Sequence, residues 1–284
     1  MIDKVEAEPS GESTLERYAR DMRLFRSLPP TPVEYRNERA LADLMLGEQA
    51  MGYVGGSGSC AGCGEATAIR MLLAATRQVY GPESMGIVAA TGCNTNTGGQ
   101  ASTACFGGQV TKLSAFGKAL HGRPEPRKEL GRILMSHGDV FVAQTTPAHI
   151  NHFYRAVMEA NAYPGPAVIV AYTACMPEHG IADDAATRQA KLAVESRAYP
   201  LFVYDPRKGP SIAERLSLTG NPSVKEDWAK EPDGTPIDFL SFARTEGRFA
   251  PHFGADGSPT PEIQATQADR LANWHTLQEL AGLR

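Results

Sequence analysis

Short apolar runs alternate with helix-forming stretches between residues 86 and 204 of this chain. The apolar runs cover residues 86–91 (GIVAAT), 139–144 (DVFVAQ), 167–172 (AVIVAY) and 201–204. Helix-forming stretches lie between the later runs, over residues 148–161 and 184–197. Strands and helices that alternate with short connections are typical of βαβ units, so the sequence predicts an α/β fold with a parallel, helix-covered sheet.

The segments on either side of this series differ from it. A capping box of Ser13 and Glu16 predicts a helix over 13–27. Further helices are expected over 37–49, 65–80 and 262–280, with a glycine-rich loop at 52–64. The tail beyond residue 205 is rich in Pro and Gly. We therefore predict three domains: an N-terminal helical extension (1–49), the α/β domain (50–205) and a C-terminal extension (206–284).

Composition excludes several classes of partner. The net charge of −4 gives no electrostatic reason to expect nucleic acid or an anionic membrane as partner. No apolar run is long enough to cross a bilayer, and the polar N-terminus lacks the apolar core of a secretion signal. A cytoplasmic, reducing location is therefore expected, in which five cysteines serve as metal ligands, catalytic groups or core residues.

Four of the cysteines fall where a parallel sheet binds ligands. Cys93 and Cys175 come just after predicted strands, and ligands of such sheets bind beyond the carboxyl ends of the strands. Cys60 and Cys63 form a C-x-x-C in GSCAGCGE, directly before the helix expected at 65–80. The sequence therefore predicts that four sulfurs can converge on one rim of the sheet.

Three kinds of site fit such a set of cysteines. Gly and Ala around the C-x-x-C leave backbone N–H groups open to a bound cluster, which suits iron–sulfur. Four separated cysteines also suit structural zinc, and one C-x-x-C alone suits a thioredoxin-like redox pair. Cys105 has small or apolar neighbours and is interpreted as a packing residue.

Several motifs together resemble one family. They are GSCAGCGE, ATGCN, NTGGQAST, GGQVTK, SAFGKALHG and AYTACMPEHGI, with LTGNP and TEGRF in the tail. The combination resembles the thiamine-diphosphate-binding and 4Fe-4S-binding C-terminal region of pyruvate:ferredoxin (flavodoxin) oxidoreductase, over roughly residues 50–255. The resemblance implies a thiamine-diphosphate-binding fold.

The resemblance also implies cofactors and site residues. A 4Fe-4S cluster would be held by Cys60, Cys63, Cys93 and Cys175. Thiamine diphosphate with Mg would lie at Gly92, Cys93, Asn96 and Thr97, with Asn96 as the catalytic residue beside the substrate.

The implied activity is oxidative decarboxylation of a 2-oxoacid, most simply pyruvate, to acyl-CoA. The cofactors would carry the chemistry while the protein orients them. The implied partners are ferredoxin or flavodoxin, coenzyme A, the 2-oxoacid and other oxidoreductase domains or subunits.

One departure from the family pattern affects the thiamine site. In the family, ATGCN and NTGGQ are separated by a long stretch with a Gly-Asp-Gly motif, which belongs to the magnesium–diphosphate site. Here Thr95 alone separates the two motifs, and Gly-Asp-Gly occurs nowhere in the chain. Magnesium needs hard oxygen ligands, usually including a carboxylate. The junction predicts that part of the central sheet is missing; a natural deletion, an engineered cut and a skipped segment in the record would all produce it.

Two functions from different classes follow. The first is the thiamine-binding and iron–sulfur component of a 2-oxoacid oxidoreductase, whose independent activity the missing motif puts in doubt. The second is a non-catalytic remnant that keeps a metal or iron–sulfur site as an electron-transfer or interaction module. Binding of thiamine diphosphate distinguishes them.

Overall fold

The structure is a computed structural model that describes residues 63–81, 106–110, 122 and 126–284, together with five residues nearer the N-terminus. Those five are all helical, in agreement with the helix expected over 13–27: Glu16, Ala19, Arg20, Arg23 and Ser27. The elements expected over 37–49 and 86–91, and most of the glycine-rich loop, lie outside the described residues.

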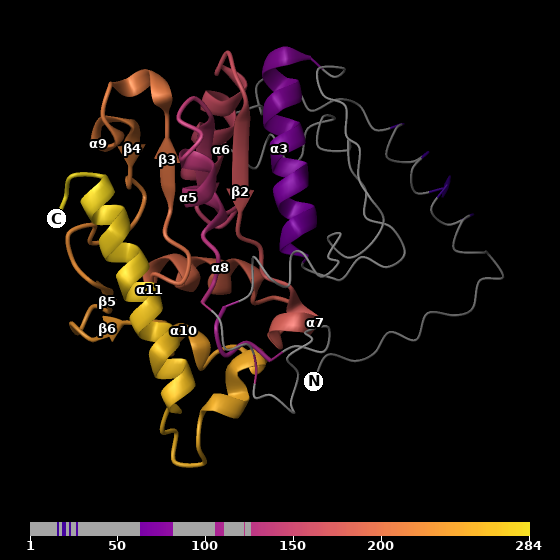
Figure 1. Cartoon of the computed structure of the whole chain (residues 1–284). Helices are drawn as coiled ribbons and strands as arrows, with labels where there is room; N and C mark the ends of the chain where they lie inside the picture. Colours follow the sequence, from indigo (N-terminus) through magenta and orange to yellow (C-terminus); the bar gives the residue numbers. More distant parts are fainter. Residues whose placement is uncertain are drawn as a thin grey trace.

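A four-stranded sheet forms the centre of the described chain (Figure 1). Its strands are β1 (Phe141–Thr145), β2 (Ala167–Ala171), β3 (Phe202–Tyr204) and β4 (Leu216–Ser217), in the order β2-β1-β3-β4. β1 is buried along its whole length, whereas β2 is half-buried with exposed ends. β2 therefore forms an edge of the sheet within the described residues.

The expected βαβ unit is present. β1 and β2 run parallel and are joined through α6 (Ile150–Asn161), which packs on both strands. α6 buries Phe153 and Val157 against α3 (Gly64–Tyr80). These two residues are four apart, the spacing that places side chains on one face of a helix. The α/β fold class is thus confirmed, with α3 and α6 as neighbours.

The sheet is mixed, not wholly parallel, because β3 runs antiparallel to β1. The longer of the two helices between β2 and β3 is α8 (Ala186–Glu195), which packs against α10 (Phe239–Ala243). In Figure 1, α8 lies across the end of the sheet where β2 finishes. The connection between β2 and β3 does not return the chain to the opposite end of the strands. The chain therefore enters β3 at the end of the sheet where β2 finishes, and β3 runs antiparallel to β1.

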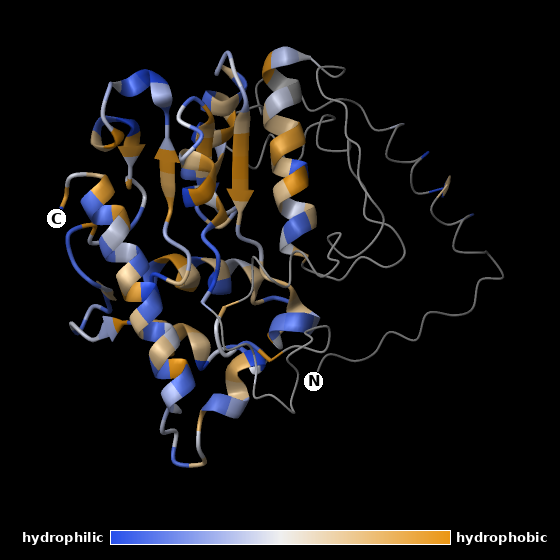
Figure 2. Cartoon of the chain, viewed as in Figure 1, coloured by the Kyte–Doolittle hydropathy of each residue, from blue (hydrophilic) through white to orange (hydrophobic). Residues whose placement is uncertain are grey.

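The tail contains the expected long helix, α11 (Pro261–Leu280), and several shorter elements. These are η5 (Pro206–Lys208), α9 (Ile212–Arg215), β5 (Ala229–Lys230), β6 (Pro236–Ile237) and η6 (Gly247–His252), besides β4 and α10; α5 (Leu130–Met135) precedes β1. Figure 2 shows apolar residues in the strands and in the facing sides of the helices. Trp274 and Leu277 of α11 pack on Val142 and Phe202 of the sheet. The domain boundary expected at residue 205 stays a prediction.

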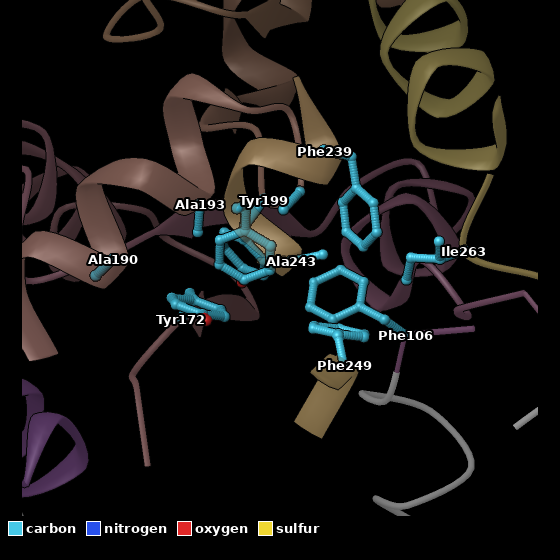
Figure 3. Packing of buried hydrophobic residues seen from close by; sticks show 11 residues of the cluster. Phe106, Tyr172, Ala190, Ala193, Tyr199, Phe239, Ala243, Phe249 and Ile263 are labelled. Carbon is cyan, nitrogen blue, oxygen red and sulfur yellow. The ribbon is translucent and has the colours of Figure 1, made fainter. Parts of the chain in front are cut away.

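An aromatic cluster joins the tail to the α/β part of the chain (Figure 3). Phe106 packs between Phe239, Phe242 and Phe249, with ring centroids 5.7–6.2 Å apart. Tilted and edge-on aromatic pairs at this separation each contribute about 0.5–1.5 kcal/mol beyond the area that they bury. The cluster therefore fixes residues 247–249 of η6 against the segment 106–110.

Candidate functional site

Two of the four cysteines predicted as metal ligands lie among the described residues. Cys63 directly precedes α3, and Cys175 directly precedes the one-turn helix α7 (Met176–His179), four residues beyond the end of β2. Both residues are half-buried, and neither forms a disulfide.

The other predicted site residues lie outside the described part of the chain. They are Cys60, Gly92, Cys93, Asn96 and Thr97, and Cys105 lies outside it as well.

A close backbone contact brings the two cysteine segments together. A Cβ atom built on Gly64 would lie 3.2 Å from the backbone N of Ala174 and 3.2 Å from Cβ of Thr173. This approach leaves little room for a side chain at position 64. The residue that follows Cys63 and the residue that precedes Cys175 are thus in contact, although they are far apart in sequence.

The amino end of α3 lies at this contact. Thr67 donates two hydrogen bonds to the carbonyl oxygen of Cys63, one from its backbone N–H (3.2 Å) and one from its hydroxyl (3.1 Å). The first N–H groups of a helix and its dipole favour a bound anion. Burial raises the pKa of Glu65 in the same turn, which reflects partial exclusion of water there.

Both backbone polar groups of Cys175, its N–H and its carbonyl oxygen, form hydrogen bonds with one residue, His179. His179 donates its backbone N–H to the carbonyl oxygen of Cys175 (2.8 Å), which closes the turn of α7. The N–H of Cys175 in turn donates to Nδ1 of the His179 ring (3.3 Å). Gly180 then ends the turn with a left-handed backbone, φ +67°.

Buried charges lie behind the His179 ring. Burial, and then the Arg248 guanidinium, hold the pKa of His179 well below its ordinary value, so the imidazole is neutral at neutral pH. Because Nδ1 accepts from Cys175, the ring proton lies on Nε2. Oε1 of Glu246 lies 3.7 Å from Nδ1 and accepts a hydrogen bond from the Tyr172 hydroxyl (3.4 Å).

Glu246 and Arg248 form an ion pair that is almost fully buried. Nε of Arg248 donates to Oε2 of Glu246, and Nη1 donates to Oε1 of Gln109 (3.0 Å). Burial raises the pKa of Glu246, while Arg248 opposes that shift. The sequence marks TEGRF only as a family-like motif, and no local pattern around it indicates that Glu246 and Arg248 are buried.

A cavity of about 470 Å³ lies elsewhere, between α5, β3, α9 and α11. Its lining includes Arg127, Glu129, Arg132 and Tyr204, and none of the residues predicted from the sequence contributes to it. The cysteine segments instead precede α3 and follow β2, at the β2 edge of the sheet (Figure 1).

Two kinds of feature are absent from the part of the chain that the structure describes. No group of three or more His, Cys, Asp or Glu residues is placed to hold a metal ion among the described residues. The helices within those residues also include none that is long and apolar enough to span a membrane.

The chain is similar in sequence to several known proteins. No family model matches the chain. The chain is 36% identical, over 194 residues, to a pyruvate-flavodoxin oxidoreductase of Rhodospirillum rubrum, which covers 66% of this chain and 14% of the relative. It is 40% identical, over 137 residues, to a probable pyruvate-flavodoxin oxidoreductase of Escherichia coli, covering 48% of this chain and 11% of the relative.

The resemblance to pyruvate:ferredoxin (flavodoxin) oxidoreductase is confirmed. A pyruvate:ferredoxin oxidoreductase of Moorella thermoacetica is 37% identical over 132 residues, or 44% of this chain and 11% of its own length. The chain thus spans about a seventh or less of the length of these relatives. The names of these three relatives agree on pyruvate and on flavodoxin or ferredoxin. A pyruvate dehydrogenase of Cryptosporidium parvum named for NADP(+) is also similar, at 29% identity over 68% of this chain and 9% of its own length.

Proposed function

We propose that this chain is the iron–sulfur-binding part of a 2-oxoacid oxidoreductase that uses ferredoxin or flavodoxin. The contact of Gly64 with Ala174 carries the proposal, because it brings the segments of Cys63 and Cys175 together at one end of the sheet. The names of the relatives support the reaction class and favour pyruvate as the 2-oxoacid.

The described residues fit an iron–sulfur cluster. Cys63 and Cys175 are half-buried cysteines outside any disulfide, and the helix end beside Cys63 favours negative charge. Cys60 and Cys93 would complete the four thiolates. A bound cluster accepts and releases single electrons. The chain's own part is to hold the thiolates, exclude water around them and keep the electron path short.

The fit to thiamine diphosphate is weaker. The chain contains no Gly-Asp-Gly, so it supplies no evident carboxylate for the magnesium ion that binds the diphosphate. Gly92, Asn96 and Thr97 are proposed to contact the cofactor on the strength of the resemblance alone, and we derive no catalytic step through it. Other domains or subunits would supply the rest of the thiamine site and the coenzyme A site.

The absent Gly-Asp-Gly also favours a second candidate. The chain would then be an electron-transfer or interaction module that keeps the cluster and has lost 2-oxoacid turnover. Both candidates require iron, whereas only the first requires thiamine diphosphate.

Anaerobic incubation of the purified chain with ferric iron, sulfide and an excess of a thiol reductant tests the shared part of the proposal. We expect bound iron, sulfide and a visible charge-transfer absorption. Cys175→Ser should abolish this absorption, whereas Cys105→Ser, at the cysteine interpreted as a packing residue, should leave it unchanged. Uptake of zinc alone, or full iron content in Cys175→Ser, would contradict the cluster assignment.

Titration calorimetry with thiamine diphosphate and magnesium then separates the two candidates. Binding, together with pyruvate-dependent reduction of ferredoxin in the presence of coenzyme A, supports the oxidoreductase component. Iron binding without any heat of thiamine binding supports the electron-transfer module.

A further inference from the structure

The backbone of Cys175 is bound by a side chain from its own turn. Cys175 has an extended backbone (φ −108°, ψ 109°) at the start of α7, and its N–H donates to Nδ1 of His179. The carbonyl oxygen of the same residue accepts the N–H of His179. Residue 179 therefore fixes both peptide groups that flank the Cα atom of Cys175, and with them the direction in which its thiol leaves the backbone.

The imidazole is held in place by its surroundings. The His179 side chain is 12% exposed, and its ring lies 6.3 Å from the ring of Tyr172, centroid to centroid. Tyr172 donates its hydroxyl to Glu246, whose second carboxylate oxygen accepts from Arg248. The ring is thus enclosed by side chains that are themselves bonded to one another.

The same network reaches a third segment of the chain. Arg248 donates its side chain to Gln109, and its carbonyl oxygen accepts the N–H of Val110 (2.9 Å). The guanidinium lies over the rings of Phe106 and Phe249, 5.3 and 5.0 Å from their centroids. Because these contacts are buried, the ion pair of Glu246 and Arg248 has few alternative positions. The hydrogen-bond network next to the His179 ring is therefore stiff.

The backbone of the Cys175 turn also contacts the segment that carries Glu246 and Arg248. Gly247, between Glu246 and Arg248, donates its N–H to the carbonyl oxygen of Gly180 (3.2 Å). A Cβ atom on Gly180 would lie 2.8 Å from the Cα atom of Gly247. Residues 245–249 thus hold the Cys175 turn through its side chain at position 179 and through its backbone at position 180.

We propose that His179 is a positioning residue for Cys175, with its ring enclosed by Tyr172 and the Glu246–Arg248 pair. The inference rests on the proposed function, since the thiol that His179 orients is the one assigned to the cluster. Partners of metal-binding side chains commonly change metal affinity about 10–100-fold when they are removed. Loss of the ring should therefore loosen the Cys175 turn and weaken retention of iron by a factor of about 10.

His179→Ala and His179→Asn together test this role. The alanine removes the acceptor of the Cys175 N–H, whereas the Oδ1 atom of asparagine occupies nearly the position of Nδ1. After reconstitution with ferric iron, sulfide and a thiol reductant, the rate of iron loss to a ferrous chelator is measured for both. We expect loss about 10-fold faster in His179→Ala and close to the unsubstituted rate in His179→Asn. His275→Ala is the matched control. It removes a histidine of α11 that is hydrogen-bonded to Asp227, and it should not change the rate of iron loss.

Alkylation of the iron-free chain gives a second readout that does not depend on the cluster. The rates at Cys175 and Cys63 are compared peptide by peptide with iodoacetamide. His179→Ala should raise the rate at Cys175 relative to Cys63, and His179→Asn should restore it. If His179→Ala does not fold, His179→Gln replaces it, because glutamine places its oxygen nearer the position of Nε2.

The outcomes separate the two proposals. Equal rates of iron loss in the unsubstituted and His179→Ala chains, or loss in His179→Asn as fast as in His179→Ala, would overturn the positioning role while leaving the cluster assignment intact. Failure of the unsubstituted chain to bind iron would overturn the proposed function instead. The alkylation ratio would then decide the positioning role alone: a selective rise at Cys175 supports it, and an unchanged ratio refutes it.

Discussion

The contact between Gly180 and Gly247 allows a quantitative test of how the Cys175 turn is held. Gly180 has φ +67°, and an added Cβ atom would lie 2.8 Å from Cα and 3.0 Å from N of Gly247. Both atoms belong to the backbone, so no side-chain rotation relieves the overlap. Gly138 is the matched control, since it has φ +83° and no atom within 4 Å of its added Cβ.

Two costs add at Gly180, whereas one operates at Gly138. Alanine in a left-handed conformation costs about 1–2 kcal/mol at either position. Overpacking against Gly247 adds about 1–3 kcal/mol at Gly180 alone. We therefore expect Gly138→Ala to lower the free energy of unfolding by about 1–2 kcal/mol and Gly180→Ala by about 2–5 kcal/mol.

Urea denaturation followed by circular dichroism measures both values under one set of conditions. The effect of Gly→Ala on the unfolded chain is similar at the two positions and cancels in their difference. The difference between the variants therefore isolates the contact with Gly247. Equal losses of stability in the two variants would refute the contact, and with it the argument that residues 245–249 hold the turn.

Three further predictions concern stability. Burial, and then Arg155, lower the pKa of His152 to about 4 in the folded chain. As the pH falls from 6.5 towards 4, the unfolded chain therefore takes up a proton that the folded chain does not, and the free energy of unfolding should fall by up to about 3 kcal/mol. Urea denaturation across this range should show a shallower slope for His152→Asn, and an identical slope would contradict the assignment. Asn221→Ala should cost about 1–3 kcal/mol in the same assay, because it leaves the buried N–H and C=O of Leu201 without their partner; a cost within the error of the assay would count against it. Trp274→Ala should cost about 3–5 kcal/mol, since the ring is fully buried and stacks on Arg197, whereas Trp228→Ala, at a half-buried position, should cost less.

The elements of the fold could be predicted where local pattern decides them. Residues 141–145 and 167–171 are short apolar runs on either side of an amphipathic helix, and that pattern alone gives the parallel pair β1–β2. The direction of β3 could not be predicted in the same way. It depends on α8 packing against α10, whose sequence lies about 50 residues further on, and no local pattern reports such a contact.

The candidate site shows the same division. The rule that ligands gather at the carboxyl ends of strands predicted where Cys175 would lie, and the structure brings it to the Cys63 segment through Gly64. The buried pair of Glu246 and Arg248 was missed, because it lies in a tail with no periodic pattern. Its burial depends on Gln109 and Phe106, which no spacing within the tail reveals.

The backbone contact between residues 180 and 247 also limits how the cysteine turn could be moved into another scaffold. Residues 175–180 alone would lack the surface against which Gly180 is packed, and any scaffold with a side chain opposite that glycine would push the turn away. A transplanted turn therefore has to carry residues 245–249 with it. Directed variation faces the same limit, because a larger residue at either glycine needs a compensating shift of the backbone at the other.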